Sequence, residues 1–410
     1  MNSHFDTIVC FKTFTEDIDP VTSDMSRIQR ASNGRYTLNS EMSFYLDMPE
    51  IANLVGAKVH NVYVDDSLNI FEEYEKHLKR LGKILFVVEP WVLHNGHFQL
   101  LDLKRCDEGC EIVVLAWDDY YYLSNIFPND FCIENIELAN LYLTNDPRSV
   151  CLLREKLGVN AHFYISTPCK KMIEITEYIQ QTLDMDPVEA TGHDIGCFMT
   201  FKNQNEYRCE LKRYLNKTFD NILIGDSNTV RVASKNISQT VQDYLKIKVH
   251  LGNTSSAWAE RSEINSESAY LKYLHDCSTP ECTSARCSST EVLLPDHFRK
   301  HRAKTKLSRC MKGVKDFIAP LANAVLIYDD FHWNKVFYQD VFPLYEYNNF
   351  ETIKETYDEV TKDKETTSQI LAKQKDWIKK HSFFNQFKYI LENDRGIFDE
   401  ALLTSEVEYS

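Results

Sequence analysis

Short apolar runs rich in β-branched residues recur along the chain, and helix-like segments separate them. The runs span residues 6–11, 58–64, 83–88, 111–117, 141–145, 194–201, 221–225, 247–252 and 323–329. Strands that alternate with helices at this spacing form βαβ units with parallel strands. Their nearly continuous apolar character is typical of strands that helices cover on both faces. The sequence therefore predicts an α/β protein built on parallel sheets.

The runs fall into two blocks, which we interpret as two Rossmann-like domains that face a central cleft. The first domain is predicted at residues 1–185 and the second at 194–380, with the polar linker DMDPVEATGHD at their junction. Ligands of such open sheets bind at the carboxyl ends of the strands. Residues 381–410 are expected to form a terminal helix and an acidic tail, and a return of this segment to the N-terminal domain is one option. The final stretch, DEALLTSEVEYS, is expected to be frayed.

The composition favours a folded protein of the cytoplasm. Hydrophobic residues make up 43% of the 410 residues, so a sizeable core can form. A formal net charge of -15 argues against a surface that binds nucleic acid or anionic lipid over its whole extent, although it leaves room for a local basic groove. No apolar run of about 18 residues predicts a transmembrane helix, and the N-terminus reads as a strand rather than a signal peptide. Most of the 12 cysteines stand alone, which fits a reducing compartment.

The most basic stretch of this acidic chain lies directly before the last predicted strand. Residues 299–315 read RKHRAKTKLSRCMKGVK. The first half of this stretch is as compatible with a solvated face as with a binding site. In the second half, Gly313 allows the backbone to approach a ligand closely, and Lys312 and Lys315 can neutralise phosphate oxygens. Asp316 then opens a predicted short helix whose N-terminal amides can also face an anion. Together these features predict a diphosphate site.

This stretch resembles the donor-binding half of the GT-B glycosyltransferases, in particular the bacterial, phage and viral branch known as glycosyl transferases group 1. The family hallmark reads roughly K-G-R-x-F-E-x-P-x-x-G-x-x-x-L. The matching positions are Lys312, Gly313, Lys315 in place of arginine, Phe317, Pro320 and the strand at residues 324–328. The resemblance covers residues 305–392, and a looser one covers residues 194–250.

The resemblance implies a two-domain GT-B fold that transfers a sugar from a nucleoside-diphosphate sugar, with a UDP-sugar as the first expectation, to an acceptor hydroxyl. It implies no required cofactor and no metal, with the donor on the second domain and the acceptor on the first. The expected donor-binding residues are Lys202, Arg208, Arg309, Lys312, Gly313, Lys315, Asp316, Phe317 and Ile318. A glycan, a protein or a hydroxymethylated DNA base stays open as the acceptor, and the acidity of the chain counts against DNA.

Two positions depart from the family hallmark. Ile318 replaces the glutamate that is expected to hold the nucleotide ribose, and Asn323 replaces a glycine. Asp316 or Asp329 could take over the ribose contact, in which case donor choice would differ. The alternative is a non-catalytic protein that kept the fold and binds a nucleotide sugar or a glycan.

Carboxylates that follow a strand of the first block are the candidate catalytic groups. Asp118 and Asp119 follow the run at residues 111–117, and the strand ends of a doubly wound sheet face its ligand. If the transfer inverts configuration, either carboxylate could deprotonate the acceptor hydroxyl. The competing interpretation is an ordinary cap and turn. Asn145 and Asp146, after the next strand, are better explained as helix caps.

A metal site is the weakest of the candidates. His275, Cys277, Cys282 and Cys287 could together hold zinc, but the cysteines are more widely spaced than in the usual zinc motifs. A loop without a metal is the favoured interpretation. No complete P-loop, zincin, esterase or dinucleotide-binding fingerprint occurs in the sequence, so those chemistries are not among the leading hypotheses.

Overall fold

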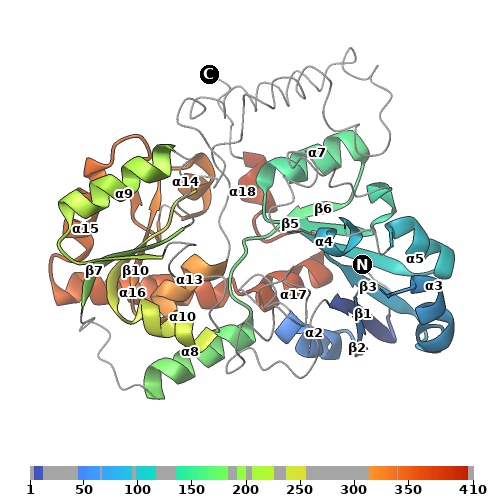
Figure 1. The fold of residues 1–410 in the computed structure, drawn as a ribbon. Helices are drawn as coiled ribbons and strands as arrows, with labels where there is room; N and C mark the ends of the chain where they lie inside the picture. Colours follow the sequence, from blue (N-terminus) through green and yellow to red (C-terminus); the bar gives the residue numbers. More distant parts are fainter. Residues whose placement is uncertain are drawn as a thin grey trace, which may run out of the picture.

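Two separate parallel sheets, each covered by helices, form the framework of the molecule (Figure 1). The computed structural model describes residues 4–12, 45–64, 67–94, 98–116, 135–182, 192–199, 206–225, 237–254, 314–338 and 340–404. The first sheet belongs to the N-terminal part of the chain and the second sheet to the C-terminal part. This arrangement confirms the predicted α/β class with two Rossmann-like parallel sheets.

The first sheet contains six parallel strands in the order β2-β1-β3-β4-β5-β6. They are β1 (Thr7–Lys12), β2 (Lys58–Tyr63), β3 (Ile84–Val88), β4 (Glu111–Ala116), β5 (Leu141–Thr144) and β6 (Ala161–Phe163). β1 pairs with both β2 and β3, so Thr7 lies in register with Lys58 on one side and Ile84 on the other. All residues of β3 are buried, as expected for a strand covered on both faces. Strand β6 was not predicted, because its three residues are too few to show a pattern.

The second sheet contains five parallel strands in the order β11-β10-β9-β7-β8. They are β7 (His193–Phe198), β8 (Ile222–Gly225), β9 (Ile247–Leu251), β10 (Val325–Asp329) and β11 (Leu344–Tyr345). In both sheets the strand order reverses beside the first strand, between β1 and β3 and between β7 and β9. These two places are the topological switch points, outside which open α/β sheets bind their ligands.

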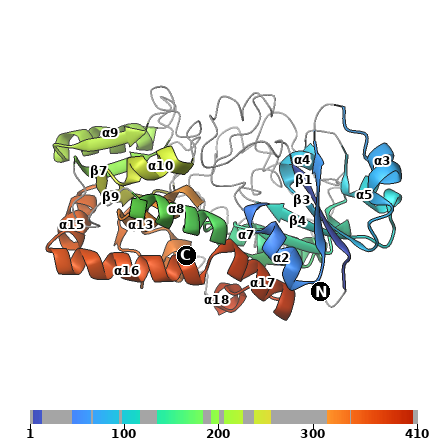
Figure 2. The ribbon, with the colours of Figure 1, turned by 90° about the horizontal axis from the view of Figure 1, so that it is seen from below.

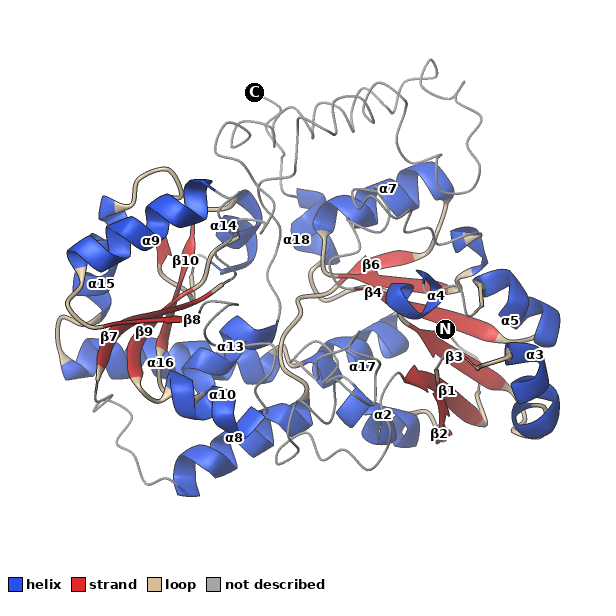
Figure 3. Ribbon diagram, in the orientation of Figure 1, coloured by secondary structure: helices blue, strands red, loops and turns tan. Residues whose placement is uncertain are grey.

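Helices cover both sheets and connect successive strands (Figure 3). Those of the N-terminal part are α2 (Met48–Leu54), α3 (Ile70–Glu73), the π-helix η2 (Tyr74–Leu78), α4 (Pro90–His94), α5 (Leu100–Cys106), the 3₁₀ helix η3 (Ile136–Leu138), α7 (Pro147–Leu157) and α8 (Lys170–Thr182). Those of the C-terminal part are α9 (Glu206–Thr218), α10 (Ile237–Tyr244), α13 (Val314–Leu321), α14 (His332–Tyr338), α15 (Glu351–Val360), α16 (Lys364–Lys380), α17 (Phe383–Asn393) and α18 (Asp399–Thr404). None of the helices described is both long enough and apolar enough to cross a membrane.

Two buried glutamines supply hydrogen-bond partners where strand pairing stops. β11 pairs only with the last two residues of β10, so none of the described strands lies beside the outer edge of β10 at Leu326. The side-chain oxygen of Gln374 in α16 accepts from the Leu326 amide at 3.0 Å, and its nitrogen donates to the Leu326 carbonyl at 2.8 Å. Gln386 of α17 makes the same pair of bonds to Ile165, at 2.9 Å and 2.8 Å. Each side chain replaces a missing strand, because buried backbone groups need partners.

The C-terminal helices pass from the second sheet to the first (Figure 2). α16 packs against α13 and β10, whereas α17 packs against α2 in the N-terminal part. The chain makes this passage at His381 and Ser382, and the Ser382 hydroxyl accepts a hydrogen bond from the Asn385 amide at the start of α17. Residues 399–404 form α18, in which Leu402 is buried. The expectation of a frayed end is therefore wrong for these residues.

Candidate functional site

The carboxyl ends of the strands in the second sheet bring together several of the polar residues singled out in the sequence. β9 ends at Leu251 and β10 ends at Asp329. Helices α9 and α13 begin at this same edge, because each runs from the carboxyl end of one parallel strand to the amino end of the next. We call these strand ends, the residues that follow them and the first turns of α9 and α13 the carboxyl edge.

Asp316 ties the first turn of α13 to two central strands. Its side chain is buried, and its Oδ1 lies 2.9 Å from Nε2 of His250 in β9. Its Oδ2 accepts a hydrogen bond of 3.3 Å from the Tyr328 hydroxyl in β10. Burial, with a further contribution from the Asp316 charge, raises the pKa of Tyr328 well above the ordinary value of a tyrosine, so this hydroxyl stays a donor at neutral pH. The start of α13 is therefore anchored to β9 and β10 by the Asp316 carboxylate.

Asp329 organises the residues that follow β9. The Thr254 amide donates to its Oδ2 at 2.7 Å, and the Thr254 hydroxyl donates to its Oδ1 at 2.8 Å. Asn334 of α14 donates to the Asp329 carbonyl at 2.9 Å. A ribose contact by Asp329 would have to compete with these bonds, so the observed role of this carboxylate is to join the ends of two neighbouring strands.

A layer of buried tyrosines supports the start of α9. Tyr207, in the first turn, stacks on Tyr347 with 4.0 Å between ring centroids and 6° between ring planes. The Asn253 side chain, just after β9, donates to the hydroxyls of Tyr207 at 3.2 Å and Tyr345 at 2.9 Å. These contacts fix the first turn of α9 to the end of β9. Arg208 follows Tyr207 directly in this turn.

The predicted donor-binding residues fall into three groups. Arg208 and Asp316 lie at the carboxyl edge, and both side chains are buried. Phe317 and Ile318 point into the interior instead: Phe317 packs against Trp377 of α16 with 5.9 Å between ring centroids, and Ile318 belongs to the hydrophobic core. Outside the described residues lie the side chain of Lys315 and the whole of Lys202, Arg309, Lys312 and Gly313.

The helix predicted to open at Asp316 begins two residues earlier. α13 starts at Val314, so Lys315 lies inside the first turn of the helix rather than in the loop before it. The amides that remain without helical partners at a helix start belong to its first turn, which is the turn that contains these two residues.

Asn323 has a left-handed backbone conformation, which glycine adopts most readily. Its φ of 67° lies in the left-handed region, which asparagine tolerates better than most side chains do. Lys375 of α16 donates a hydrogen bond to its side-chain oxygen. Asn323 therefore fits the turn from α13 into β10.

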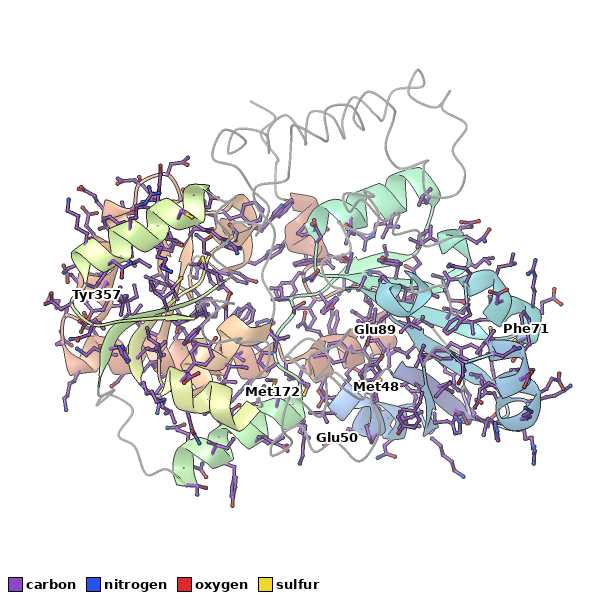
Figure 4. All side chains as sticks on the ribbon, in the orientation of Figure 1. Met48, Glu50, Phe71, Glu89, Met172 and Tyr357 are labelled. Carbon is purple, nitrogen blue, oxygen red and sulfur yellow. The ribbon has the colours of Figure 1, made fainter. Side chains whose placement is uncertain are left out.

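The first sheet carries buried polar residues at its own carboxyl edge. Glu89 follows β3 at the switch point and lies beside α4 (Figure 4), and Asn145 and Asp146 follow β5. The predicted catalytic residues Asp118 and Asp119 lie outside the described residues. Sequence reasoning did not select Glu89, although a carboxylate directly after an apolar run was a usable signal. Its position at the switch point depends on strand order, which the sequence does not show.

Within the part of the chain that the structure describes, no group of three or more His, Cys, Asp or Glu side chains could hold a metal ion. Burial raises the pKa of Cys106 to about 11 and that of Cys110 to about 12, so both are thiols at neutral pH. The candidate zinc ligands lie outside the described residues, and they are His275, Cys277, Cys282 and Cys287.

Comparison with known proteins finds likeness in structure alone. No family model matches the sequence, and no curated protein matches it. The structure is similar to sucrose-phosphate synthase from Thermosynechococcus elongatus, with 9% identity and a TM-score of 0.48 over 94% of this chain and 97% of that one. It is also similar to an α1,3-fucosyltransferase, with 11% identity and a TM-score of 0.38 over 96% of this chain and 92% of that one. Since both TM-scores lie below 0.5, the proposed function rests on the residues of this chain.

Proposed function

We propose that the chain is a glycosyltransferase that moves a sugar from a nucleoside-diphosphate sugar to an acceptor hydroxyl without a metal ion. The donor would bind at the carboxyl edge of the second sheet, and the acceptor would approach from the first sheet. A UDP-sugar is the first candidate donor, and a glycan is the first candidate acceptor.

The observation that carries this proposal is the place where α13 begins. Lys312 and Gly313 directly precede its first turn, and α13 follows β9, one of the two strands at the switch point. A helix start at this edge presents amide hydrogens and partial positive charge, which suit a diphosphate. His250 and Tyr328 hold the turn in place through Asp316. Asp316 then serves the site by anchoring the helix start, and the lysines supply the charge.

The chemistry required of these residues is electrostatic. When the bond between the anomeric carbon and the diphosphate oxygen breaks, negative charge grows on the leaving phosphate, where Lys312, Lys315 and helix amides would stabilise it. In an inverting transfer, a carboxylate takes the acceptor proton while the acceptor oxygen bonds to the anomeric carbon. Asp118 and Asp119 are the candidates from the sequence. Glu89 is added because it lies at the switch point of the first sheet.

A panel of UDP-, GDP-, ADP- and TDP-sugars tests the proposal, with nucleotide binding and sugar release measured on the same preparations. The double variant Lys312→Ala with Lys315→Ala is expected to bind the preferred nucleotide at least ~10-fold more weakly, because each charge-assisted hydrogen bond contributes roughly 1.5–3 kcal/mol. Its melting temperature should stay close to that of the wild type. The matched control replaces two exposed lysines of α16, Lys364 and Lys373, with alanine.

The outcomes separate three hypotheses. Weaker binding in the first double variant alone supports a diphosphate site at the start of α13, whereas equal affinity of the two double variants moves the site elsewhere. Binding without turnover across a set of glycan acceptors favours a non-catalytic sugar-nucleotide-binding protein. A hydroxymethylated DNA acceptor would reveal itself by duplex binding that weakens steeply with salt.

A further inference from the structure

A buried histidine and a buried aspartate meet at the first turn of α13. His250 of β9 is fully buried, Asp316 is 3% exposed, and Nε2 of His250 lies 2.9 Å from Oδ1 of Asp316. Asp316 is the third residue of α13, so its carboxylate belongs to the turn at which the proposed diphosphate site begins. A change in the charge of this pair therefore acts on the start of the helix that would hold the donor.

The second ring nitrogen of His250 is not fixed by a hydrogen bond. Nδ1 is buried and has no hydrogen-bond partner among the described residues, so no neighbour there dictates whether it carries a proton. The Phe198 ring of β7 lies nearly parallel to the imidazole, with 5.5 Å between ring centroids, and an aromatic face stabilises positive charge beside it. Because His250 and Asp316 are in direct contact, they take up and release a proton as a unit.

The other titratable groups around the pair include three buried tyrosines, which are Tyr244 of α10, Tyr328 of β10 and Tyr338 of α14. Burial, with a further contribution from the Asp316 charge, raises the pKa of all three well above the ordinary value of a tyrosine. Two more titratable groups act on Tyr244, namely Cys197 of β7 and Asp243, whose carboxylate contacts Lys246 at 3.4 Å. None of the three tyrosines changes charge near neutral pH, which leaves His250 and Asp316 as the buried pair that can.

The charge of the pair acts on the same helix start as a bound diphosphate would. Negative charge is stabilised near a helix N-terminus, and the Asp316 carboxylate already takes that position in α13. A diphosphate at the start of α13 would therefore share one helical turn with the negative charge of Asp316. One proton on the pair removes one unit of this negative charge, whichever of the two residues carries it. Diphosphate binding and protonation thus favour each other, and this coupling is reciprocal.

Building on the function proposed above, we propose that His250 and Asp316 form a proton-linked pair, through which the donor site binds a nucleotide sugar together with a proton. His250 is a positioning residue in this scheme, because it acts on the donor through Asp316 and the start of α13. Donor affinity is then highest on the acidic side of neutrality, where the pair holds the proton. It falls as the pH rises and the pair releases the proton.

Titration calorimetry on the full chain tests the coupling. The probes are UDP-, GDP-, ADP- and TDP-glucose, and the tightest binder of the four is used for the measurements. The diphosphate of these probes is esterified at both ends, so its own charge stays constant between pH 6 and pH 8. Titrations at one pH in buffers of different ionisation enthalpy give the number of protons taken up. We expect the affinity of the wild type to fall about 10-fold from pH 6 to pH 8, which corresponds to an average uptake of about half a proton per nucleotide sugar bound.

Two variants identify the pair as the source of the proton. His250→Gln keeps a donor toward Asp316 but cannot take up a proton, whereas Asp316→Asn removes the negative charge with little change of shape. Both variants should bind with an affinity that is nearly independent of pH. His250→Gln should bind as weakly as the wild type does at pH 8, and Asp316→Asn as tightly as the wild type does at pH 6. If Asp316 instead held the ribose of the donor, Asp316→Asn would bind more weakly than the wild type at both pH values.

His162→Asn is the matched control. His162 is also buried, and its Nδ1 lies 2.7 Å from Oδ2 of Asp399, but it belongs to β6 of the first sheet. This variant should keep the pH dependence of the wild type. The proposal would be overturned, with the donor site left intact, if the wild type took up no proton or if the uptake persisted in His250→Gln and Asp316→Asn. If none of the four nucleotide sugars binds, the proposed function fails as well. If His250→Gln does not fold, the wild type and Asp316→Asn decide the question by the same measurement.

Discussion

Gln374 is the residue at which the structure makes its sharpest prediction about stability. Its side-chain amide is fully buried and pairs with both backbone groups of Leu326, at 3.0 Å and 2.8 Å. Gln374→Met keeps the length of the side chain and removes both hydrogen bonds. The Leu326 amide and carbonyl would then remain buried at a strand edge beside which the described part of the chain places no other strand. Each orphaned group costs roughly 1–3 kcal/mol, with the carbonyl at the lower end. We therefore expect a loss of about 2–4 kcal/mol in the free energy of unfolding.

Urea denaturation followed by circular dichroism measures this loss as a lower midpoint at unchanged slope. The matched control is Gln369→Met on the same helix, where the side chain is exposed and donates only to Glu365. That change should fall within about 0.5 kcal/mol of the wild type, as surface substitutions usually do. If the two methionine variants were equally stable, the claim that Gln374 replaces a missing strand would be refuted.

Gln374→Glu adds a test through pH. The ionised carboxylate can accept from the Leu326 amide, but it repels the Leu326 carbonyl, whereas the protonated acid can donate to that carbonyl. The pKa of this glutamate should therefore be higher in the folded protein than in the unfolded chain. The Gln374→Glu variant should be most stable below the pKa of the glutamate in the unfolded chain, roughly 4.3. It should lose this added stability as the pH rises through the pKa of the glutamate in the folded protein. If the difference in unfolding free energy between this variant and the wild type did not become smaller at acidic pH, the hydrogen bonds assigned between residue 374 and Leu326 would be contradicted.

Two further predictions concern the carboxyl edge and the start of α8. Gly252→Ala should cost about 1–3 kcal/mol in thermal unfolding, because its Cβ would lie 2.5 Å from the buried ring of Tyr328, whereas Gly109→Ala, with only a 3.4 Å contact, should cost little. Burial raises the pKa of Asp47 to about 6, against the opposing hydrogen bonds from the Lys170 and Lys171 amides. Between pH 4 and pH 7, the free energy of unfolding of the wild type should therefore fall by about 3 kcal/mol relative to that of Asp47→Asn. Parallel curves of unfolding free energy against pH for the two proteins would rule this out.

Local patterns were sufficient to predict most of the framework. A run of five or six buried apolar residues can be recognised without knowledge of its neighbours, and strands such as β3 and β10 begin and end close to their predicted bounds. Parallel pairing followed from the helices between the runs. Residues 70–78 show the limit of such patterns: α3 begins at Ile70 and continues as a π-helix, because hydrophobic periodicity does not report which hydrogen-bonding pattern a turn adopts.

By itself, the sequence determined that two parallel α/β sheets would form, and that a cationic, glycine-containing segment would precede the last long strand. Only the tertiary structure decided which side chains meet. From the sequence, Asp316 was predicted to bind the donor, whereas in the structure its two oxygens contact His250 and Tyr328. The end of the chain was expected to be frayed, whereas Asp399 of α18 contacts His162 of the first sheet and the preceding Phe398 packs against Phe337 of the second domain. The physical reason is that apolar periodicity is encoded within about ten neighbouring residues. Hydrogen bonds and ring contacts between residues more than two hundred positions apart, such as His162 and Asp399, depend on how whole elements pack.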